Sequence, residues 1–163
     1  MNWYLLTPEL LLAGCVLLVM AIDMCPGAWK RHVIGLVAFT GLLIAGACLW
    51  TQRDIIDFAA NGMYVFDDFA VVMKCLFLGI TAVVIILTHE FMAQHDMLRG
   101  EFHLLVLMAC IGMLFLASVN DFLLLFVSLE LMTFSFYIMT AYVRSDRRSV
   151  EAGLNSIATP FMQ

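Results

Sequence analysis

Charged residues are scarce in this sequence. Of its 163 residues, only 13% are Asp, Glu, Lys or Arg, whereas 64% are hydrophobic and the mean hydropathy is +1.00. A soluble globular domain carries about twice that share of charge, so the composition excludes that class and indicates an integral membrane protein. The formal net charge of -5 argues against a nucleic-acid partner.

Motifs for soluble cofactors and metals are also missing. The sequence has no Walker A loop and no glycine-rich dinucleotide fingerprint. His89-Glu90 is followed by Ala93 where a zinc-protease motif needs its second His. The five cysteines are odd in number and lack C-x-x-C spacing, which argues against disulfides and iron–sulfur ligation. Any redox cofactor is therefore expected on another chain.

Long apolar runs are what the sequence has in abundance. A helix needs about 20 residues to cross a bilayer. Five runs approach that length: Thr7–Met24, 32–50, 69–88, 102–118 and 122–143. Pro8 suits the first turn of the first helix, and Asp121 is placed to cap the fifth. We therefore expect an all-α fold, a polytopic transmembrane helix bundle of about five spans, forming a single domain over residues 1–163 in a lipid bilayer.

The longest connection, residues 53–68, contains a possible hairpin. Its Asn61-Gly62 pair lies between Ile55-Ile56 and Tyr64-Val65, and Asn-Gly is a favoured two-residue hairpin turn. The hairpin would lie on the membrane surface.

Basic residues concentrate on alternate connections. Six of the eight Lys and Arg residues lie there: Lys30, Arg31, Arg99, Arg144, Arg147 and Arg148. By the positive-inside rule, the N-terminus is predicted outside and the cluster near Arg148 in the cytoplasm.

One carboxylate, Glu130, falls in the middle of the fifth apolar run. An ionisable group in hydrocarbon costs about 2.5–3.5 kcal/mol on insertion scales, so such a residue usually has a function. Thr133, Tyr137, Thr140 and Arg144 follow at helical spacing. Glu130 is therefore predicted to begin a polar stripe of the kind a proton relay requires. The alternative is a structural stripe whose hydroxyls bond to their own helix.

Three stretches together resemble a known family. They read NDFLLLFVSLELMTFSFYIMTAYVRSDRRSVEAGL, EFHLLVLMACIGMLFLAS and FDDFAVVMKCLFL. They are similar to the subunit N family of bacterial NADH-quinone oxidoreductase (respiratory complex I), over nearly all of residues 1–154. Antiporter-like subunits of cation/proton antiporter complexes share the mid-span Glu, so a cation/proton antiporter subunit is an alternative.

The resemblance implies a membrane-arm subunit that takes part in proton translocation coupled to quinone reduction, in the bacterial inner (plasma) membrane. Glu130 takes the place of the family's acid that pairs with a lysine on a later helix. Lys74 and Glu101 match charged positions and are expected to support proton handling. The implied partners are other membrane-arm subunits of complex I. FMN, iron–sulfur clusters and quinone are expected on partner subunits, and no cofactor or metal on this chain.

Simpler roles were open for several of these side chains. Glu101 could be an ordinary helix-terminal anion, and Lys74 could extend its amine to the interface. Glu9 and Asp23 flank the two ends of the first span, where either could face a partner subunit or be an ordinary acid at the membrane interface. The histidines are expected in solvated or interfacial positions: His32, His89, His95 and His103.

After EAGL the sequence departs from the family. Asn155 stands where the family has a lysine, and residues 155–163, which include Pro160, are too few for another span. These residues are interpreted as an atypical tail, from a truncated or frameshifted copy or from a fragment of a longer gene. The later lysines that should partner Glu130 are then missing. A non-functional truncated membrane remnant is a further alternative.

Overall fold

The computed structural model describes residues 3–24, 30–53, 57–59, 62–94 and 100–141. Within these ranges the chain forms five long helices: α1 (Thr7–Met24), α2 (Lys30–Gln52), α3 (Asp68–Gln94), α4 (Gly100–Ala117) and α5 (Phe122–Thr140). A short 3-10 helix, η1 (Trp3–Leu6), precedes α1. All five helices are long and apolar enough to cross a membrane, which confirms the predicted all-α, multi-pass fold.

The helix ends follow the signals in the sequence. α1 has the predicted bounds. Pro8 lies in its first turn, where a backbone N–H would have no partner within the helix, so the N–H that proline lacks is not needed. Asp121 caps α5, because its carboxylate accepts a hydrogen bond from the Leu123 N–H at 3.1 Å. α3 continues beyond the predicted residue 88 to Gln94.

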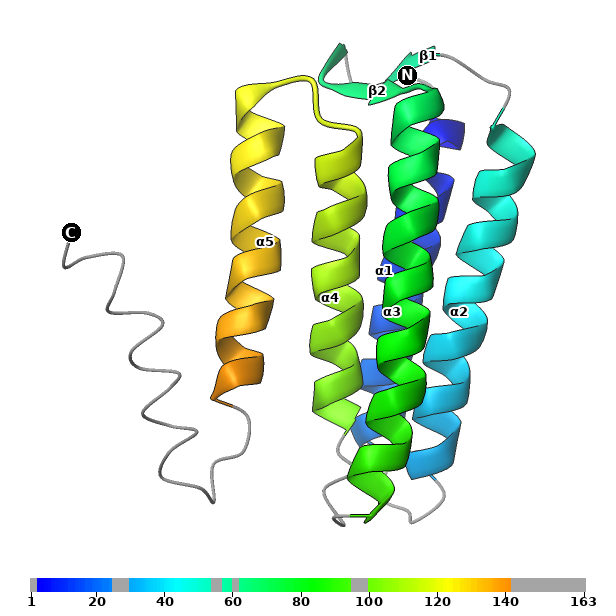
Figure 1. Ribbon diagram of the computed structural model, residues 1–163, viewed down its shortest axis with the longest axis vertical. Helices are drawn as coiled ribbons and strands as arrows, with labels where there is room; N and C mark the ends of the chain where they lie inside the picture. Colours follow the sequence, from blue (N-terminus) through cyan, green and yellow to red (C-terminus); the bar gives the residue numbers. More distant parts are fainter. Residues whose placement is uncertain (1–2, 25–29, 54–56, 60–61, 95–99, 142–163) are drawn as a thin grey trace, which may run out of the picture.

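A small β-hairpin lies across one end of the bundle (Figure 1). β1 (Asp57–Ala59) pairs antiparallel with β2 (Tyr64–Phe66). Gly62 has a φ of 88°, a conformation that glycine adopts without strain. The predicted hairpin is therefore present, but its first strand is 57–59, and four residues, 60–63, join the strands rather than the expected two. Ile55, Ile56 and Asn61 lie outside the described residues.

The hairpin is hydrogen-bonded to the turn between α4 and α5. The Val65 N–H donates to the Ser118 carbonyl at 2.9 Å, and the Asn120 N–H donates to the Met63 carbonyl at 2.9 Å. The Asn120 side chain also donates to the Gly62 carbonyl at 2.7 Å. These three hydrogen bonds connect residues 62–65 of the hairpin with residues 118–120 of the turn. They hold the hairpin in place over α1 and α3.

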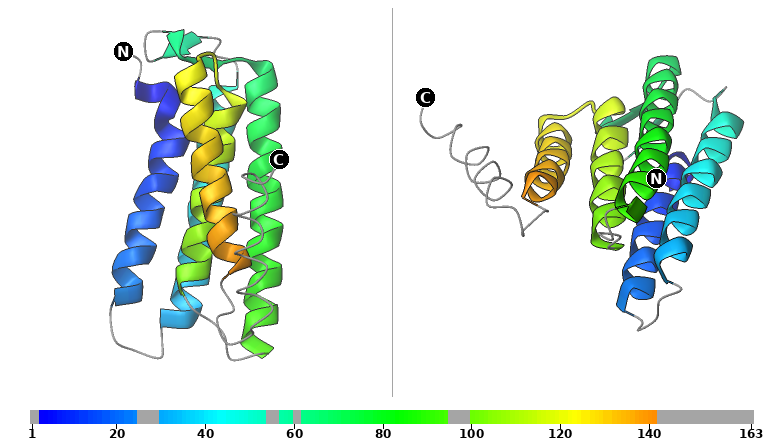
Figure 2. Two further views of the ribbon diagram at one scale, coloured as in Figure 1. Left: turned by 90° about the vertical axis from the view of Figure 1, so that its left-hand side faces the viewer. Right: turned by 60° about the horizontal axis from the view of Figure 1, so that its bottom comes forward.

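α4 is the central helix of the bundle. It packs against α1, α2, α3 and α5, whereas α5 packs mainly against α4 and forms one edge (Figures 1 and 2). Half of the α4 span is buried, compared with 11% of the α5 span. Large apolar side chains such as Phe126, Phe134 and Leu76 are exposed, as lipid-facing residues are in a membrane protein.

Small residues bring α4 and α5 close together. A Cβ added at Gly112 would lie 3.0 Å from the Met132 nitrogen and 3.1 Å from the Ser128 oxygen. Ser128 and Ser135, seven positions apart, are the buried residues of α5. Close approach at small residues is the usual packing mode of membrane helices. The α5 face opposite these serines therefore points away from the bundle.

The predicted orientation in the membrane remains a prediction. Arg144, Arg147 and Arg148, on which it partly depends, lie outside the described residues, as do residues 155–163 of the predicted tail.

Candidate functional site

A buried ion pair joins α1 to α3. The Lys74 ammonium lies 2.7 Å from Glu9 Oε1, and the two side chains are 0% and 1% exposed. Taking two such charges out of water is costly, and their mutual attraction offsets that cost only when the geometry is good and further hydrogen bonds are present. The surroundings of the pair therefore decide whether it is stable.

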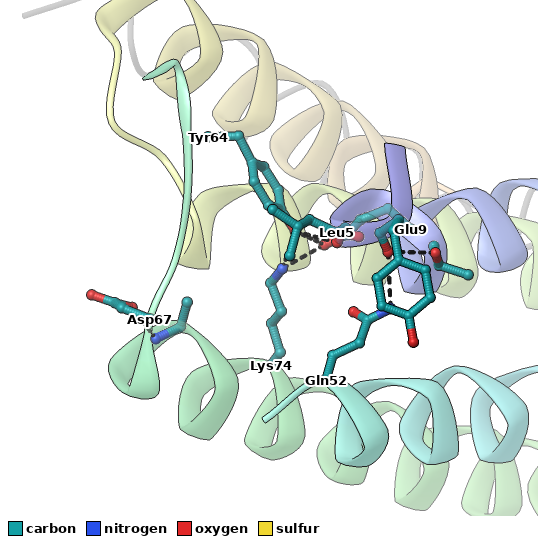
Figure 3. A network of polar contacts seen from close by, with 9 residues as sticks. Leu5, Glu9, Gln52, Tyr64, Asp67 and Lys74 are labelled. Atoms are coloured by element: carbon teal, nitrogen blue, oxygen red, sulfur yellow. Dashed lines mark hydrogen bonds and ion pairs between the residues drawn. The ribbon is translucent and has the colours of Figure 1, made fainter. Parts of the chain in front are cut away.

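Tyr64, from β2, supplies those hydrogen bonds (Figure 3). Its hydroxyl lies 2.9 Å from Glu9 Oε1 and 3.2 Å from the Leu5 carbonyl, and it can donate to either. The same hydroxyl accepts a hydrogen bond from the Lys74 ammonium. Glu9, Lys74 and Tyr64 thus form a closed set of three, which we call the buried triad.

Aromatic rings complete the environment of the ammonium. Lys74 Nζ lies 4.6 Å from the centre of the Tyr64 ring and 5.0 Å from that of Phe66. Both rings come from β2, and Phe66 is fully buried. A desolvated cation over an aromatic face gains about 2 kcal/mol or more. The hairpin therefore acts as a cover that stabilises the charge as well as closing the bundle.

The local sequence explains why these groups meet. Glu9 lies in the first turn of α1, where a carboxylate interacts favourably with the helix dipole. Lys74 lies in the second turn of α3. Both are at the end of the bundle that the hairpin covers, and β2 places Tyr64 between them (Figure 3).

Gln52, at the end of α2, extends the network. Its Nε2 donates to the Tyr4 carbonyl at 2.9 Å, next to the Leu5 carbonyl that Tyr64 approaches. Gln52 is 1% exposed. Two buried acceptors in this region, Glu9 Oε2 and Gln52 Oε1, have no hydrogen-bond partner among the described residues.

Electrostatics keep the Tyr64 hydroxyl protonated. Burial, followed by the charge of Glu9, raises the pKa of Tyr64 well above its ordinary value. Tyr64 is therefore a hydrogen-bond donor throughout the ordinary pH range.

The structure corrects two simpler expectations at this site. Lys74 does not extend to the interface, because its amine is bonded inside the bundle. Glu9 is not an exposed interfacial acid, because it is buried between α1, α3 and the hairpin.

Glu130 has a contrasting position. It is exposed on α5, on the side opposite Ser128 and Ser135, and its carboxylate has no partner among the described residues. The hydroxyls of Thr133 and Thr140 donate hydrogen bonds to carbonyls of their own helix, each at 2.8 Å. This is the behaviour expected if the polar stripe is purely structural. That alternative leaves the carboxylate itself unexplained. Arg144 lies outside the described residues.

Glu101 is also separate from the buried triad. It is exposed in the first turn of α4, where the helix dipole favours an anion. The structure therefore does not bring Glu130, Lys74 and Glu101 together, and their roles in proton handling remain predictions.

Other candidate ligands give no metal site. The described residues contain no group of three or more His, Cys, Asp or Glu side chains that could hold a metal ion. His103 is buried, with 2% exposure, so a solvated position is wrong for this residue, whereas the interfacial position expected as the other possibility stays a prediction. The side chains of His32, His89 and His95 lie outside the described part of the structure.

Sequence reasoning identified Lys74 but missed its partners. The position of Glu9 at the end of the first span indicates an interfacial acid, and Tyr64 is recognisable in the sequence only as part of the hairpin. A usable signal was present, because each of the two charges lies in an apolar helix near the same predicted membrane face. Two opposite charges at one depth are candidates for pairing.

Comparison with known proteins identifies the relatives of the chain. No protein-family model matches it. It is 32% identical over 155 residues to the NADH-quinone oxidoreductase subunit N of Granulibacter bethesdensis, a match that covers 94% of this chain and 32% of that protein. The chain is a relative of NADH-quinone oxidoreductase subunit N. The resemblance noted in the sequence is thereby confirmed.

Two further relatives agree with this result. Subunit N 2 of Chloroherpeton thalassium is 36% identical, with 92% of this chain and 30% of that protein covered. The NAD(P)H-quinone oxidoreductase subunit 2 of a Synechococcus strain is 30% identical, with 93% of this chain and 29% of that protein covered. The chain thus spans about a third of the length of the curated subunit N proteins that it matches.

Proposed function

We propose that this chain forms part of a membrane-arm subunit of a proton-pumping NADH:quinone oxidoreductase, respiratory complex I, and takes part in proton translocation coupled to quinone reduction. The observation that carries the proposal is its similarity, over 94% of its length, to a protein named NADH-quinone oxidoreductase subunit N. The five membrane-spanning helices and the carboxylate at mid-depth in α5 agree with such a role.

Glu130 is the proposed proton-handling acid. Its outward position on α5 leaves it accessible to a charged group on another helix. A cation brought near favours the carboxylate, and its withdrawal into a low-dielectric environment favours the protonated acid. Lys74, buried in the triad, and Glu101, at the opposite end of the bundle, are proposed as supporting charges.

The proposal extends to the surroundings of the chain. Its partners would be other membrane-arm subunits of complex I in the bacterial inner (plasma) membrane. FMN, iron–sulfur clusters and the quinone site would belong to partner subunits. The five long helices are apolar enough to cross a membrane, which suits a subunit of the membrane arm.

Replacement of Glu130 tests the proposal. In the assembled complex, Glu130→Gln should lose most of the proton pumping that accompanies quinone reduction, while the membrane level of the chain stays unchanged. Pumping is measured as acidification or as pH-gradient formation in vesicles driven by NADH. Glu130→Asp should restore part of the pumping, because it restores a carboxylate.

Asp68→Asn is the matched control, since Asp68 is an exposed acid in the first turn of α3. It should pump as the unmodified chain does. Unchanged pumping in Glu130→Gln would overturn the role of Glu130. Exchange of a metal cation for protons without any redox partner would instead favour the cation/proton antiporter alternative.

A further inference from the structure

The Glu9 carboxylate uses its two oxygens very differently. Oε1 accepts from the Lys74 ammonium at 2.7 Å and lies 2.9 Å from the Tyr64 hydroxyl. Oε2 is buried and has no partner among the described residues. Buried polar atoms in proteins are nearly always hydrogen-bonded, and internal water serves those that protein groups do not reach. We therefore expect a hydrogen-bond donor, such as an internal water molecule, next to Oε2.

Gln52 shows the same need at the same end of the bundle. Its Nε2 is bonded to the Tyr4 carbonyl, but its buried Oε1 has no partner among the described residues. Both Oε1 of Gln52 and Oε2 of Glu9 are acceptors. A water molecule donates hydrogen bonds to acceptors, and a carboxylate oxygen has a second way of satisfying this need, which is to bind a proton.

We propose that Glu9 is a second proton-binding residue of this chain, which exchanges its proton with internal water at Oε2 while Lys74 and Tyr64 hold Oε1. This inference rests on the proposed role in proton translocation and adds a site to it. The buried triad is separated from Glu130 by α4, since α5 packs mainly against α4 (Figure 1).

Tyr64 can accommodate both protonation states of Glu9. Its hydroxyl has one proton and two acceptors within reach, Glu9 Oε1 at 2.9 Å and the Leu5 carbonyl at 3.2 Å. When Glu9 is ionised, the carboxylate is the stronger acceptor and takes the hydrogen bond. When Glu9 is protonated, the Leu5 carbonyl can take it instead. Neither state leaves the Tyr64 donor without a partner.

The proton balance of the pair is simple. A proton from hydronium binds Glu9 Oε2 and leaves water, which takes the Glu9–Lys74 pair from neutral to singly positive. Return of that proton from Oε2 to a water molecule re-forms hydronium and restores the neutral ion pair, while the Lys74 ammonium stays bonded to Oε1 at 2.7 Å throughout. One cycle takes up and releases one proton at Glu9.

The groups around the pair come from every packed element. Asp67, in the turn before α3, is a further carboxylate that acts on Lys74. From α4, Cys110 lies within electrostatic range of Glu9. Gln52 of α2 is uncharged, and Tyr64 of β2 remains protonated. Asp67 thus supplies negative charge that offsets the positive state of the pair.

Infrared difference spectroscopy tests the proposal in the chain as assembled in its own membrane. As the pH is lowered, the unmodified chain should gain a carbonyl stretching band of a protonated carboxyl that shifts in D2O. The band should be lost in Glu9→Gln and retained in Tyr4→Phe, a control at an exposed position. The double variant Glu9→Gln/Lys74→Met should also lack the band, and it avoids the stranded Lys74 charge that could unfold the single variant.

Identical spectra for the unmodified chain and the folded double variant would overturn the inference, because Glu9 would then be ionised throughout and the pair purely structural. This outcome is distinguishable from failure of the proposed function. If Glu130→Gln abolishes pumping but no Glu9 band exists, only the inference fails. If the Glu9 band exists but pumping is independent of Glu130, the role of Glu130 fails.

Discussion

Glu9 and Glu130 are both carboxylates in apolar helices, but their surroundings differ in almost every respect. Glu9 is 1% exposed, pairs with Lys74 and is covered by the hairpin. Glu130 is exposed on the outer face of α5 and has no partner among the described residues. The same chemical group is therefore stabilised by the bundle in one place and left accessible in the other.

The difference shows what each position requires. A buried charge needs a counter-charge and hydrogen bonds from its own fold, and α1, α3 and β2 supply them to Glu9. A mid-depth carboxylate on an outer face needs another helix to cover it or must become protonated. The triad is thus a feature that this bundle can complete, whereas Glu130 is suited to interactions with other helices.

The largest expected effect comes from breaking the ion pair. Glu9→Gln or Lys74→Met alone should lower the free energy of unfolding by about 3–5 kcal/mol, because each leaves a buried charge without its partner. The double variant should recover most of that loss. Denaturant titration in detergent measures the effect, and Glu130→Gln is the control that should change little. Single variants as stable as Glu130→Gln would contradict the contrast between the two carboxylates.

A smaller effect is expected from removing one hydroxyl. Tyr64→Phe should lower the free energy of unfolding by about 1–3 kcal/mol, since Glu9 loses a donor and Lys74 an acceptor. Tyr4→Phe removes the same hydroxyl from a side chain that is 58% exposed and should be neutral. Equal stability of the two variants would mean that the Tyr64 hydroxyl contributes nothing to the stability of the Glu9–Lys74 pair.

The packing of α5 can be tested at Gly112. Gly112→Ala should cost about 1–3 kcal/mol, because the new Cβ would lie 3.0 Å from the backbone nitrogen of Met132. Gly79→Ala adds the same methyl group where nothing lies within 4 Å, and it should be neutral or stabilising. Cross-linking of cysteines placed across α4 and α5 would report the separation. A neutral Gly112→Ala would put the outward direction of Glu130 in question.

The smallest expected effect concerns the cap of α5. Asp121→Ala should cost about 1 kcal/mol through loss of the bond to the Leu123 N–H, while Asp121→Asn should keep that bond. Amide hydrogen exchange in the first turn of α5 would measure it. Faster exchange in both variants, or in neither, would contradict the capping role.

Much of the fold could be predicted because the bilayer restricts the choices. Length and hydropathy located the spans, since a chain in lipid must bond its own backbone as a helix. The Asn61-Gly62 pair indicated the hairpin, in which Gly62 adopts a positive φ, and Asp121 indicated the start of α5.

The site was harder to predict. Lys74 could be noticed as a charge in an apolar run, but its pairing with Glu9 joins positions 65 residues apart and depends on how the helices pack. The direction in which the Glu130 side chain points was also hard to predict. Helical spacing placed the polar stripe on one face, yet apolar residues surround α5 on the other faces and gave no sign of which one meets α4.

Purification of the chain from its native membrane in mild detergent tests the central claim most directly, with identification of every protein and cofactor that accompanies it. As part of a complex I membrane arm, the chain should migrate with membrane-arm subunits and with subunits carrying FMN and iron–sulfur clusters. Migration without any such subunit, under conditions that keep those subunits together, would contradict the account and favour an antiporter or a membrane remnant.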